Sequence, residues 1–215
     1  RYAAHDAEAA PLLERVLSDA SGDNPVGLDI ETFVPPEMAP APVLKLTRNG
    51  AQVVKSKDDK TGLDPHRAQV RLLQVYGGGA TCAVLDMQTV SWKVLAPLWS
   101  RQLLIHNSQF ELGFFRAQNI FLDHVECTMQ AAGLMLGVHR RGLAKAAEEY
   151  LGWQMPKNLQ VSDWGAQSLS EDQLAYAALD AVAALLLWDK LEKELKSSGR
   201  WDAYLLQRDA VPGAV

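Results

Sequence analysis

The sequence predicts an α/β or α+β fold in which a β-sheet is followed by a mainly helical C-terminal half. Short apolar or alternating runs bounded by glycine and proline dominate before residue 106, and runs with helical spacing dominate after it. The 215 residues, 48% of them hydrophobic, are enough to bury a substantial core. We therefore expect a sheet flanked by helices.

The first half predicts one helix and several strands. An amphipathic helix is expected at about residues 7–19, followed by a strand at Val26–Thr32. Two apolar runs flank Asn49-Gly50 and favour a hairpin whose loop is longer than two residues, and a second, antiparallel hairpin is joined by three glycines; the four strands are 43–46, 51–54, 70–76 and 81–85.

The second half contains one short strand, at 103–105, among segments with helical spacing. The longest helix begins near Ser170, where Ser170 and Gln173 have the spacing of a capping box. The other expected helices are 90–99, 108–118, 128–136 and 142–151.

Composition limits the classes of protein. The net charge of -5 argues against binding nucleic acid through a broad positive surface, but a nuclease with an acidic metal site fits it. Two cysteines, Cys82 and Cys127, are too few for a disulfide framework. The longest apolar run, Ala181–Trp188, is too short to span a bilayer. We expect an intracellular, cytoplasmic protein of a bacterium or phage, with an organelle as the alternative, and no membrane partner. The start at Arg1 suggests a chain cut from a longer parent, or processed.

The strand at Val26–Thr32 carries two carboxylates on one face. Because side chains alternate along a strand, Asp29 and Glu31 point the same way as Gly27 and away from the apolar residues between them. Neighbouring carboxylates repel each other and are costly to desolvate, so a cation should meet them. A divalent metal ion would satisfy them; a strand end that reaches solvent is the alternative.

Two further acids have suitable positions. In the apolar run of the long helix, the polar residues Tyr176 and Asp180 lie one turn apart on one face. An ionised Asp there is costly unless it binds a metal or pairs with a distant arginine or a backbone cap. Glu111 lies in the first turn of another helix. By itself it would complement the helix dipole, but together with the other acids it would be a third metal-facing carboxylate.

Three motifs contain these residues: Asp29-x-Glu31, Asn107-x-x-x-Glu111 and Tyr176-x-x-x-Asp180. Their order and separations resemble the three motifs of the DEDDy class of 3′-5′ exonucleases. The resemblance covers about residues 26–195 and implies an α/β, ribonuclease H-like fold with a mixed sheet flanked by helices. The middle motif usually ends in Asp, so Glu111 is a departure from the pattern.

Supporting segments are similar to proofreading domains of family A DNA polymerases and to relatives of ribonuclease D. These segments are 71–74, 157–164 and 169–178. The resemblance implies a single-stranded DNA 3′ end as the substrate, with RNA possible, and a polymerase domain in cis as the partner. The alternatives are a stand-alone ribonuclease D-like exoribonuclease and a catalytically silent nucleic-acid-binding domain.

The resemblance also implies residue roles in a two-metal-ion phosphodiesterase that releases nucleoside 5′-monophosphates. Two divalent cations, Mg²⁺ or Mn²⁺, would be held by four carboxylates, those of Asp29, Glu31, Glu111 and Asp180. Tyr176 would position the attacking water. Thr32, Asn107 and Phe110 are candidates for holding the terminal nucleotide, although Phe110 suits core packing equally well.

The same likeness suggests a division of the chain. Residues 1–199 form the exonuclease domain, and 33–63 is an insertion that borders the substrate cleft. Residues 200–215 form a helical segment leading towards a polymerase domain that this chain lacks. Candidate phosphate contacts, each of which could also be an ordinary surface charge, are Arg67, 139–141 and Lys157.

Overall fold

A six-stranded mixed sheet forms the centre of the protein. The computed structural model describes residues 1–22, 24–39, 43–47, 50–54, 61–156 and 162–210. The strands are β1 (Tyr2–Ala3), β2 (Val26–Phe33), β5 (Gln69–Tyr76), β6 (Cys82–Asp86), β7 (Leu103–Ile105) and β8 (Val125–Cys127). Their order is β1-β6-β5-β2-β7-β8, in which the β2–β5 and β5–β6 pairs are antiparallel and the others parallel. The predicted mixed sheet is confirmed.

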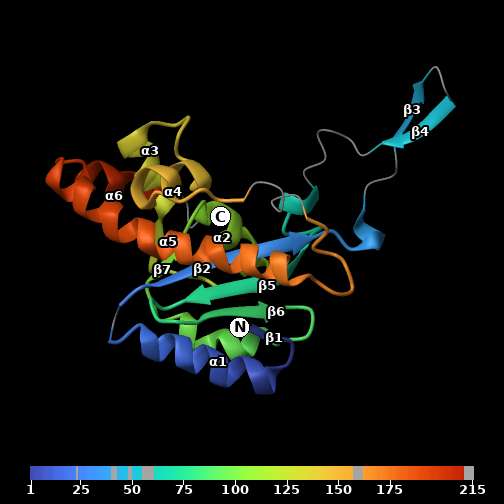
Figure 1. Cartoon of the computed structure of the whole chain (residues 1–215), viewed down its shortest axis with the longest axis horizontal. Coiled ribbons are helices and arrows are strands. Elements are labelled where there is room, and N and C mark those ends of the chain that lie inside the picture. Colours follow the sequence, from blue (N-terminus) through green and yellow to red (C-terminus); the bar gives the residue numbers. More distant parts are fainter. Residues whose placement is uncertain (23, 40–42, 48–49, 55–60, 157–161, 211–215) are drawn as a thin grey trace.

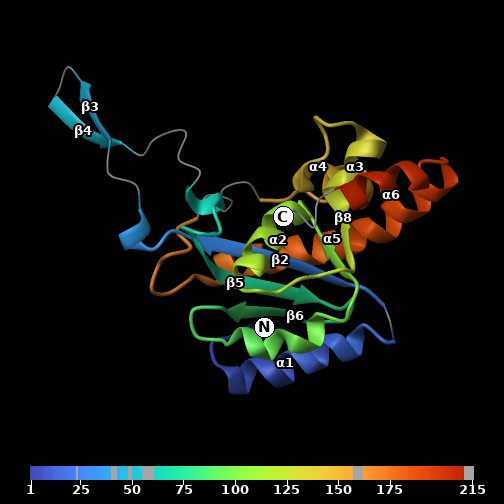
Figure 2. The same cartoon turned by 180° about the vertical axis from the view of Figure 1, so that it is seen from behind.

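Helices cover both faces of this sheet. One face packs against α1 (Asp6–Asp19), the 3₁₀ helix η3 (Trp92–Leu98) and α2 (Ser108–Ala117), in one large apolar cluster. The long helix α5 (Glu171–Ser197) crosses the other face, as Figure 1 shows, and Figure 2 shows α2 from behind. Beside α5 lie α3 (Thr128–Leu136), α4 (Leu143–Leu151) and α6 (Trp201–Ala210), which share a second cluster with it.

Strand β2 fixes how closely α5 approaches the sheet. Its apolar residues Val26, Leu28 and Ile30 are at most 4% exposed and belong to the cluster on the α1 and α2 side. On the α5 side, a Cβ atom added to Gly27 would lie 2.1 Å from the Ala181 carbonyl oxygen. The backbones of β2 and α5 therefore meet at a contact that admits only glycine.

Most predicted elements form close to their expected bounds, and α5 begins with the predicted capping box. The backbone N–H of Gln173 donates to Ser170 Oγ (3.2 Å), and the N–H of Ser170 donates to Gln173 Oε1 (3.0 Å). These reciprocal bonds satisfy two backbone donors at the helix start. They fix where the helix begins, and therefore where Tyr176 and Asp180 lie along it.

Three local predictions differ from the structure. Within residues 90–99, the structure has the 3₁₀ helix η3 (Trp92–Leu98), which contains Pro97 and so lacks an N–H that a longer α-helix would need. Strands β1 and β8 were not predicted, because two or three residues are too few for a periodic signal. In the hairpin of β3 (Val43–Thr47) and β4 (Gly50–Val54), Thr47 pairs with Gly50, so the expectation of a loop longer than two residues is wrong.

Helix α6 is attached to the sheet by a buried polar network. Tyr204 is 0% exposed; its hydroxyl donates to Glu126 Oε2 (2.5 Å) and accepts from the backbone N–H of Cys127 (3.0 Å). Arg208 Nη1 lies 2.9 Å from Glu126 Oε1, and the Tyr204 ring packs against Trp188 of α5. The helical nature of residues 201–210 agrees with the prediction, and these residues contribute to the same core as the sheet.

Replacing Tyr204 with Phe should destabilise the protein without removing any of the predicted metal ligands. The change leaves Glu126 and the Cys127 N–H short of a partner, and we expect a loss of about 1–3 kcal/mol in the free energy of unfolding. Urea unfolding measures it. Tyr150→Phe is the matched control, because Tyr150 bonds Glu194 at an exposed site. An equal loss of unfolding free energy in both variants would show that burial of the Tyr204 hydroxyl does not set the cost of removing it.

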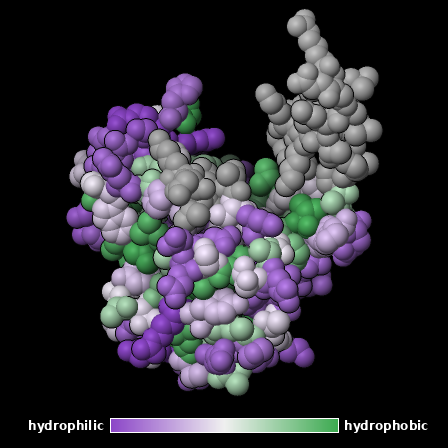
Figure 3. Space-filling view, turned by 45° about the vertical axis from the view of Figure 1, so that its right-hand side comes forward, coloured by the Kyte–Doolittle hydropathy of each residue, from purple (hydrophilic) through white to green (hydrophobic). Residues whose placement is uncertain are grey.

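The exterior is mixed in character. On the face drawn in Figure 3, hydrophobic side chains are scattered among hydrophilic ones. Among the residues that the structure describes, no helix combines the length and hydropathy of a membrane span.

Candidate metal centre

Three carboxylates converge between β2 and α5. Oxygen atoms of Asp29, Glu31 and Asp180 all lie within 4.8 Å of one another. Asp29 and Glu31 share the α5-facing side of β2, and Asp180 directly precedes Ala181, whose carbonyl meets Gly27. The close contact between strand and helix therefore brings together acids that are about 150 residues apart in the sequence.

Helix α2 supplies the fourth acid, Glu111. The residue before the helix, Asn107, has φ 74° and ψ 47°, a left-handed conformation that Asn tolerates better than most residues. The turn places Glu111 in the first helical turn, where it is 2% exposed. Glu111 is not part of the cluster of three, but the charge of Glu31 acts on Glu111, and the charge of Glu111 acts on Asp29.

All four acids hold their protons more strongly than usual. Burial, with the charges of Asp180, Glu31 and Glu111, raises the pKa of Asp29 well above its ordinary value. Burial and the charge of Asp180 raise the pKa of Glu31 to about 8, and burial raises the pKa of Asp180 to about 7. The pKa of Glu111 is also well above its usual range, mainly because of burial. The four carboxyl groups therefore lie together in surroundings that disfavour their ionised forms.

The donor set fits hard divalent cations. Asp180 Oδ1 and Glu111 Oε2 are buried without a hydrogen-bond partner, and no ion pair among the described residues includes any of the four acids. Ionised oxygen atoms without cationic partners are typical ligands of Mg²⁺ and Mn²⁺. A bound cation would stabilise the ionised forms of these carboxyl groups, which burial and, to a smaller extent, the neighbouring charges make unfavourable.

Tyr176 lies one turn before Asp180 on α5 and is 8% exposed. Burial, followed by the charges of Asp180, Glu31 and Asp29, raises its pKa above the ordinary value. Its side chain is thus a neutral phenol that can donate and accept hydrogen bonds beside the carboxylates. This chemistry suits orientation of a water molecule rather than removal of its proton.

The residues predicted to hold substrate adjoin this cluster in different ways. Thr32 follows Glu31, and its hydroxyl donates to the Gly62 carbonyl (2.9 Å) in the 3₁₀ turn η2 (Thr61–Leu63). The ring of Phe110 packs edge-on against Phe114 at 5.0 Å between centroids, so it serves the core. Asn107 makes no side-chain bond that caps α2.

The predicted phosphate contacts are distributed over several surfaces. Arg67 donates to the Met38 carbonyl (2.9 Å), and Arg140 forms an ion pair with Glu149. Lys157 lies outside the described residues. Arg67 and Arg140 therefore already have partners within the protein.

Arg71 supports the site and was not singled out as a functional residue. It is 2% exposed, pairs with Asp86 (3.2 Å) and donates to the carbonyls of Trp164 (3.1 Å) and Ala166 (2.6 Å). Trp164 packs in one cluster with Tyr176, so Arg71 holds the segment against which that tyrosine rests. The signal in the sequence was a charged residue inside an apolar strand.

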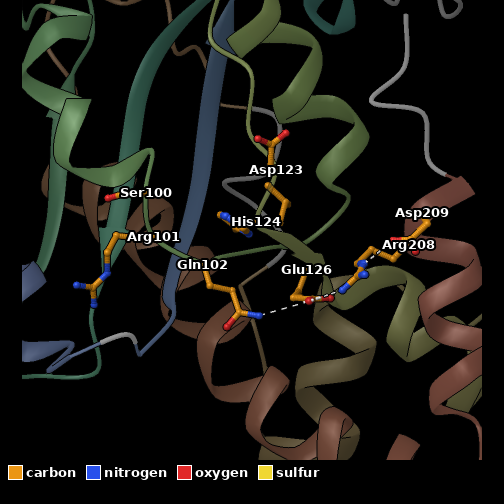
Figure 4. A pocket seen from close by; sticks show the side chains of 9 residues that line it. Ser100, Arg101, Gln102, Asp123, His124, Glu126, Arg208 and Asp209 are labelled. Atoms are coloured by element: carbon orange, nitrogen blue, oxygen red, sulfur yellow. Dashed lines mark hydrogen bonds and ion pairs between the residues drawn. The ribbon is translucent and has the colours of Figure 1, made fainter.

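A polar cavity lies away from the carboxylates. It has a volume of about 490 Å³, and Figure 4 shows Arg208 and Gln102 both directed at Glu126 within it. It is lined by residues at the amino ends of β7 and β8 and by the end of α6, whereas the carboxyl ends of the two strands lead to Asn107 and α3. Arg208 already forms ion pairs with Glu126 and Asp209, so its charge is not available to bind a ligand in the cavity.

A sequence model described as "3'-5' exonuclease" matches residues 59–196, a range that includes Glu111, Tyr176 and Asp180 but begins after Asp29 and Glu31. DNA polymerase I of Aquifex aeolicus is 33% identical over 131 residues, which are 59% of this chain and 22% of that protein. Ribonuclease D of a Shewanella species is 30% identical over 140 residues, 62% of this chain and 35% of that protein.

The chain thus spans between a fifth and about a third of these curated relatives. Among solved structures, Brucella melitensis NrnC is 25% identical with a TM-score of 0.69, and the match covers 91% of this chain and 85% of that one. The resemblance predicted from the three motifs is confirmed, as is a helix-flanked mixed sheet of the ribonuclease H-like type.

Proposed function

The chain belongs to the 3′-5′ exonuclease family, and on this premise we propose that it shortens single-stranded DNA from the 3′ end as a proofreading exonuclease. The products would be nucleoside 5′-monophosphates. One observation carries the proposal: oxygens of Asp29, Glu31 and Asp180 lie within 4.8 Å of one another without an ion-pair partner in the described residues.

We assign two divalent cations, Mg²⁺ or Mn²⁺, to the acidic residues. Asp29, Glu31 and Asp180 would hold one cation, and Asp29 with Glu111 would hold or orient the second. When bound, such ions activate a water molecule and stabilise charge on the phosphate and on the leaving 3′ oxygen. Glu111 has one methylene more than the usual Asp, and its position in the first turn of α2 supports its reach towards Glu31.

The neighbouring residues would orient the reactants. The phenol of Tyr176, neutral at physiological pH, would hold the attacking water by hydrogen bonding. Thr32 and Asn107 would border the terminal nucleotide. Phe110 would contribute mainly by supporting α2 from the core, and only its exposed edge would meet a base.

A second substrate class has support of its own. The structure of Brucella melitensis NrnC bound to pGG is 25% identical to this chain, and the match covers 84% of that protein. A ribonuclease D relative is also similar. The alternative activity is therefore removal of nucleotides from RNA or very short oligonucleotides, and a catalytically silent nucleic-acid-binding domain is the third alternative.

The domain assignment belongs to the same proposal. Residues 1–199 would be the exonuclease domain, with 33–63 an insertion beside the substrate path; the bond from Thr32 to Gly62 at the end of that segment supports this place. A proofreading role implies an intracellular setting and a polymerase domain in the same polypeptide. The reading frame that follows Val215 in the gene tests that partner directly.

The activity is tested with matched single-stranded DNA, single-stranded RNA and pGG. The longer oligonucleotides carry a 5′ label and are incubated with Mg²⁺ or Mn²⁺, with EDTA and Asp29→Ala as controls. A metal-dependent ladder that shortens DNA from the 3′ end, absent in both controls, is the expected result. Faster removal from RNA or pGG would select the alternative substrate.

The Glu111→Asp variant distinguishes an active site that the longer Glu111 side chain weakens from a catalytically silent domain. Intact substrates in every lane, with no gain of activity in Glu111→Asp, would overturn the enzymatic proposal. Activity that appears or rises in this variant would show that the longer side chain limits a working site.

A further inference from the structure

Gln74 on β5 is a buried polar residue that the proposed mechanism does not use. It is 0% exposed, and neither its Oε1 nor its Nε2 atom has a hydrogen-bond partner within the described part of the chain. Such groups are rare in folded proteins, because a buried carboxamide that loses water and gains no partner is unfavourable. A role for this amide should explain its place in the core.

The strand register places Gln74 beside one particular acid. In the antiparallel β2–β5 pair, Gln74 is directly opposite Asp29, and on its other side it is opposite Val84 of β6. Opposed residues share a face, with Cβ atoms about 4.5–5.5 Å apart. The Gln74 amide therefore has an apolar neighbour on one side and a carboxylate within side-chain reach on the other.

Helix α5 closes the layer in which Gln74 lies. Val84 packs in one cluster with Tyr176 and Ala177 of α5, and Cys82 Sγ lies 3.7 Å from the Ala178 carbonyl oxygen. The carbonyls of the helix interior already accept a hydrogen bond from their own helix, and that of Ala178 also accepts from Cys82 Sγ. The Asp29 carboxylate thus remains as the ionisable acceptor directly across the sheet.

We propose that Gln74 is a positioning residue for Asp29, and that its side-chain N–H donates to the Asp29 carboxylate when this group binds a divalent cation. The bond would fix which oxygen of Asp29 faces the ion. This inference rests on the metal site of the proposed function. Carboxylates that bind metals are usually held by such outer hydrogen bonds, whose loss weakens metal affinity by about 10–100-fold.

Gln74→Met tests this role because methionine has nearly the same length and volume but cannot donate. Mn²⁺ binding is measured by calorimetry on the protein without nucleic acid, and urea unfolding is measured on the metal-free protein. We expect Mn²⁺ affinity to fall by about 10–100-fold, while the metal-free protein stays at least as stable as the wild type because an unpartnered amide is removed. Gln69→Met, at an exposed position of the same strand, should change neither quantity.

The outcomes separate this inference from the proposed function. A wild-type protein that does not bind Mn²⁺ would contradict the metal site itself. A wild-type protein that binds Mn²⁺ and a Gln74→Met variant that binds it equally well would overturn the positioning role alone. A loss of affinity accompanied by lower metal-free stability, in both Gln74→Met and Gln74→Leu, would also overturn it, because a displaced strand would explain both effects.

Discussion

Asp180→Asn should abolish exonuclease activity and at the same time stabilise the metal-free protein at pH 8.5. We expect activity to fall by more than about 100-fold, since even outer hydrogen-bond partners of a metal site contribute about 10–100-fold. The rise in stability follows from the removal of a charge that burial disfavours and that repels Glu31 when no cation is bound.

The sign follows from the direction of the pKa shifts. Burial raises the pKa of Asp180 to about 7 and contributes to a Glu31 pKa of about 8, both above the values in an unfolded chain. The folded, metal-free protein therefore binds more protons than the unfolded chain over this range. The stability that these groups contribute to the folded, metal-free protein is fully present below about pH 4 and is lost as the pH rises through about 7–8. Divalent cations need the ionised form, so their affinity rises over the same window.

Thermal unfolding in EDTA at pH 5.5 and pH 8.5 measures the effect. At pH 8.5 we expect Asp180→Asn to melt at least about 2 °C above the wild type, the change that about 1 kcal/mol produces in a protein of this size. At pH 5.5 the two proteins should be nearly equal, because protonated Asp and Asn are both neutral. Adding Mn²⁺ at pH 8.5 should raise the melting temperature of the wild type much more than that of the variant.

Asp172→Asn is the control for this experiment, because Asp172 is an exposed acid in the first turn of the same helix. It should leave activity and the response to Mn²⁺ unchanged. A metal-free Asp180→Asn protein that melts below the wild type at pH 8.5 would refute the claim that the ionised Asp180 destabilises the metal-free fold. Retained activity would show that Asp180 does not hold a cation needed for the reaction.

The local parts of this site follow directly from sequence periodicity. Alternation along β2 puts Asp29 and Glu31 on one face, and the capping box at Ser170 places Tyr176 and Asp180 one turn apart. Both are rules of a single element, in which neighbours in sequence determine neighbours in space. The resemblance of three spaced motifs then identified which elements should meet.

The contacts between elements could not be derived in this way. Nothing near Arg71 in the sequence indicates that it bonds the carbonyls of Trp164 and Ala166, more than 90 residues away. The opposition of Gln74 and Asp29 needs the register of two strands separated by the hairpin segment. The strand register depends on how the strands pack together, because the same strand would show the same alternation of side chains beside another partner strand.

Gly27→Ala should separate β2 from α5 and disable the metal site without removing any carboxylate. The added Cβ would lie 2.1 Å from the Ala181 carbonyl oxygen and 3.1 Å from Leu185 Cβ. Backbone cannot yield as a flexible side chain does, so α5 must shift, and overpacking of this kind costs about 1–3 kcal/mol. The shift carries Asp180 away from Asp29, and a misplacement of about 1 Å can reduce a catalytic rate by about 100-fold.

Gly77→Ala provides a matched clash at a helix that carries none of the four carboxylates. A Cβ atom there would lie 2.1 Å from the Val16 carbonyl oxygen of α1, the same distance as at Gly27. Both variants should lose stability in urea unfolding, but only Gly27→Ala should also lose Mn²⁺ affinity and activity in the fraction that remains folded. Equal metal affinity in both would mean that the β2–α5 contact supports the fold alone. Loss confined to Gly27→Ala would mean that the absence of a side chain at residue 27 sets the distance from Asp29 and Glu31 on β2 to Asp180 on α5.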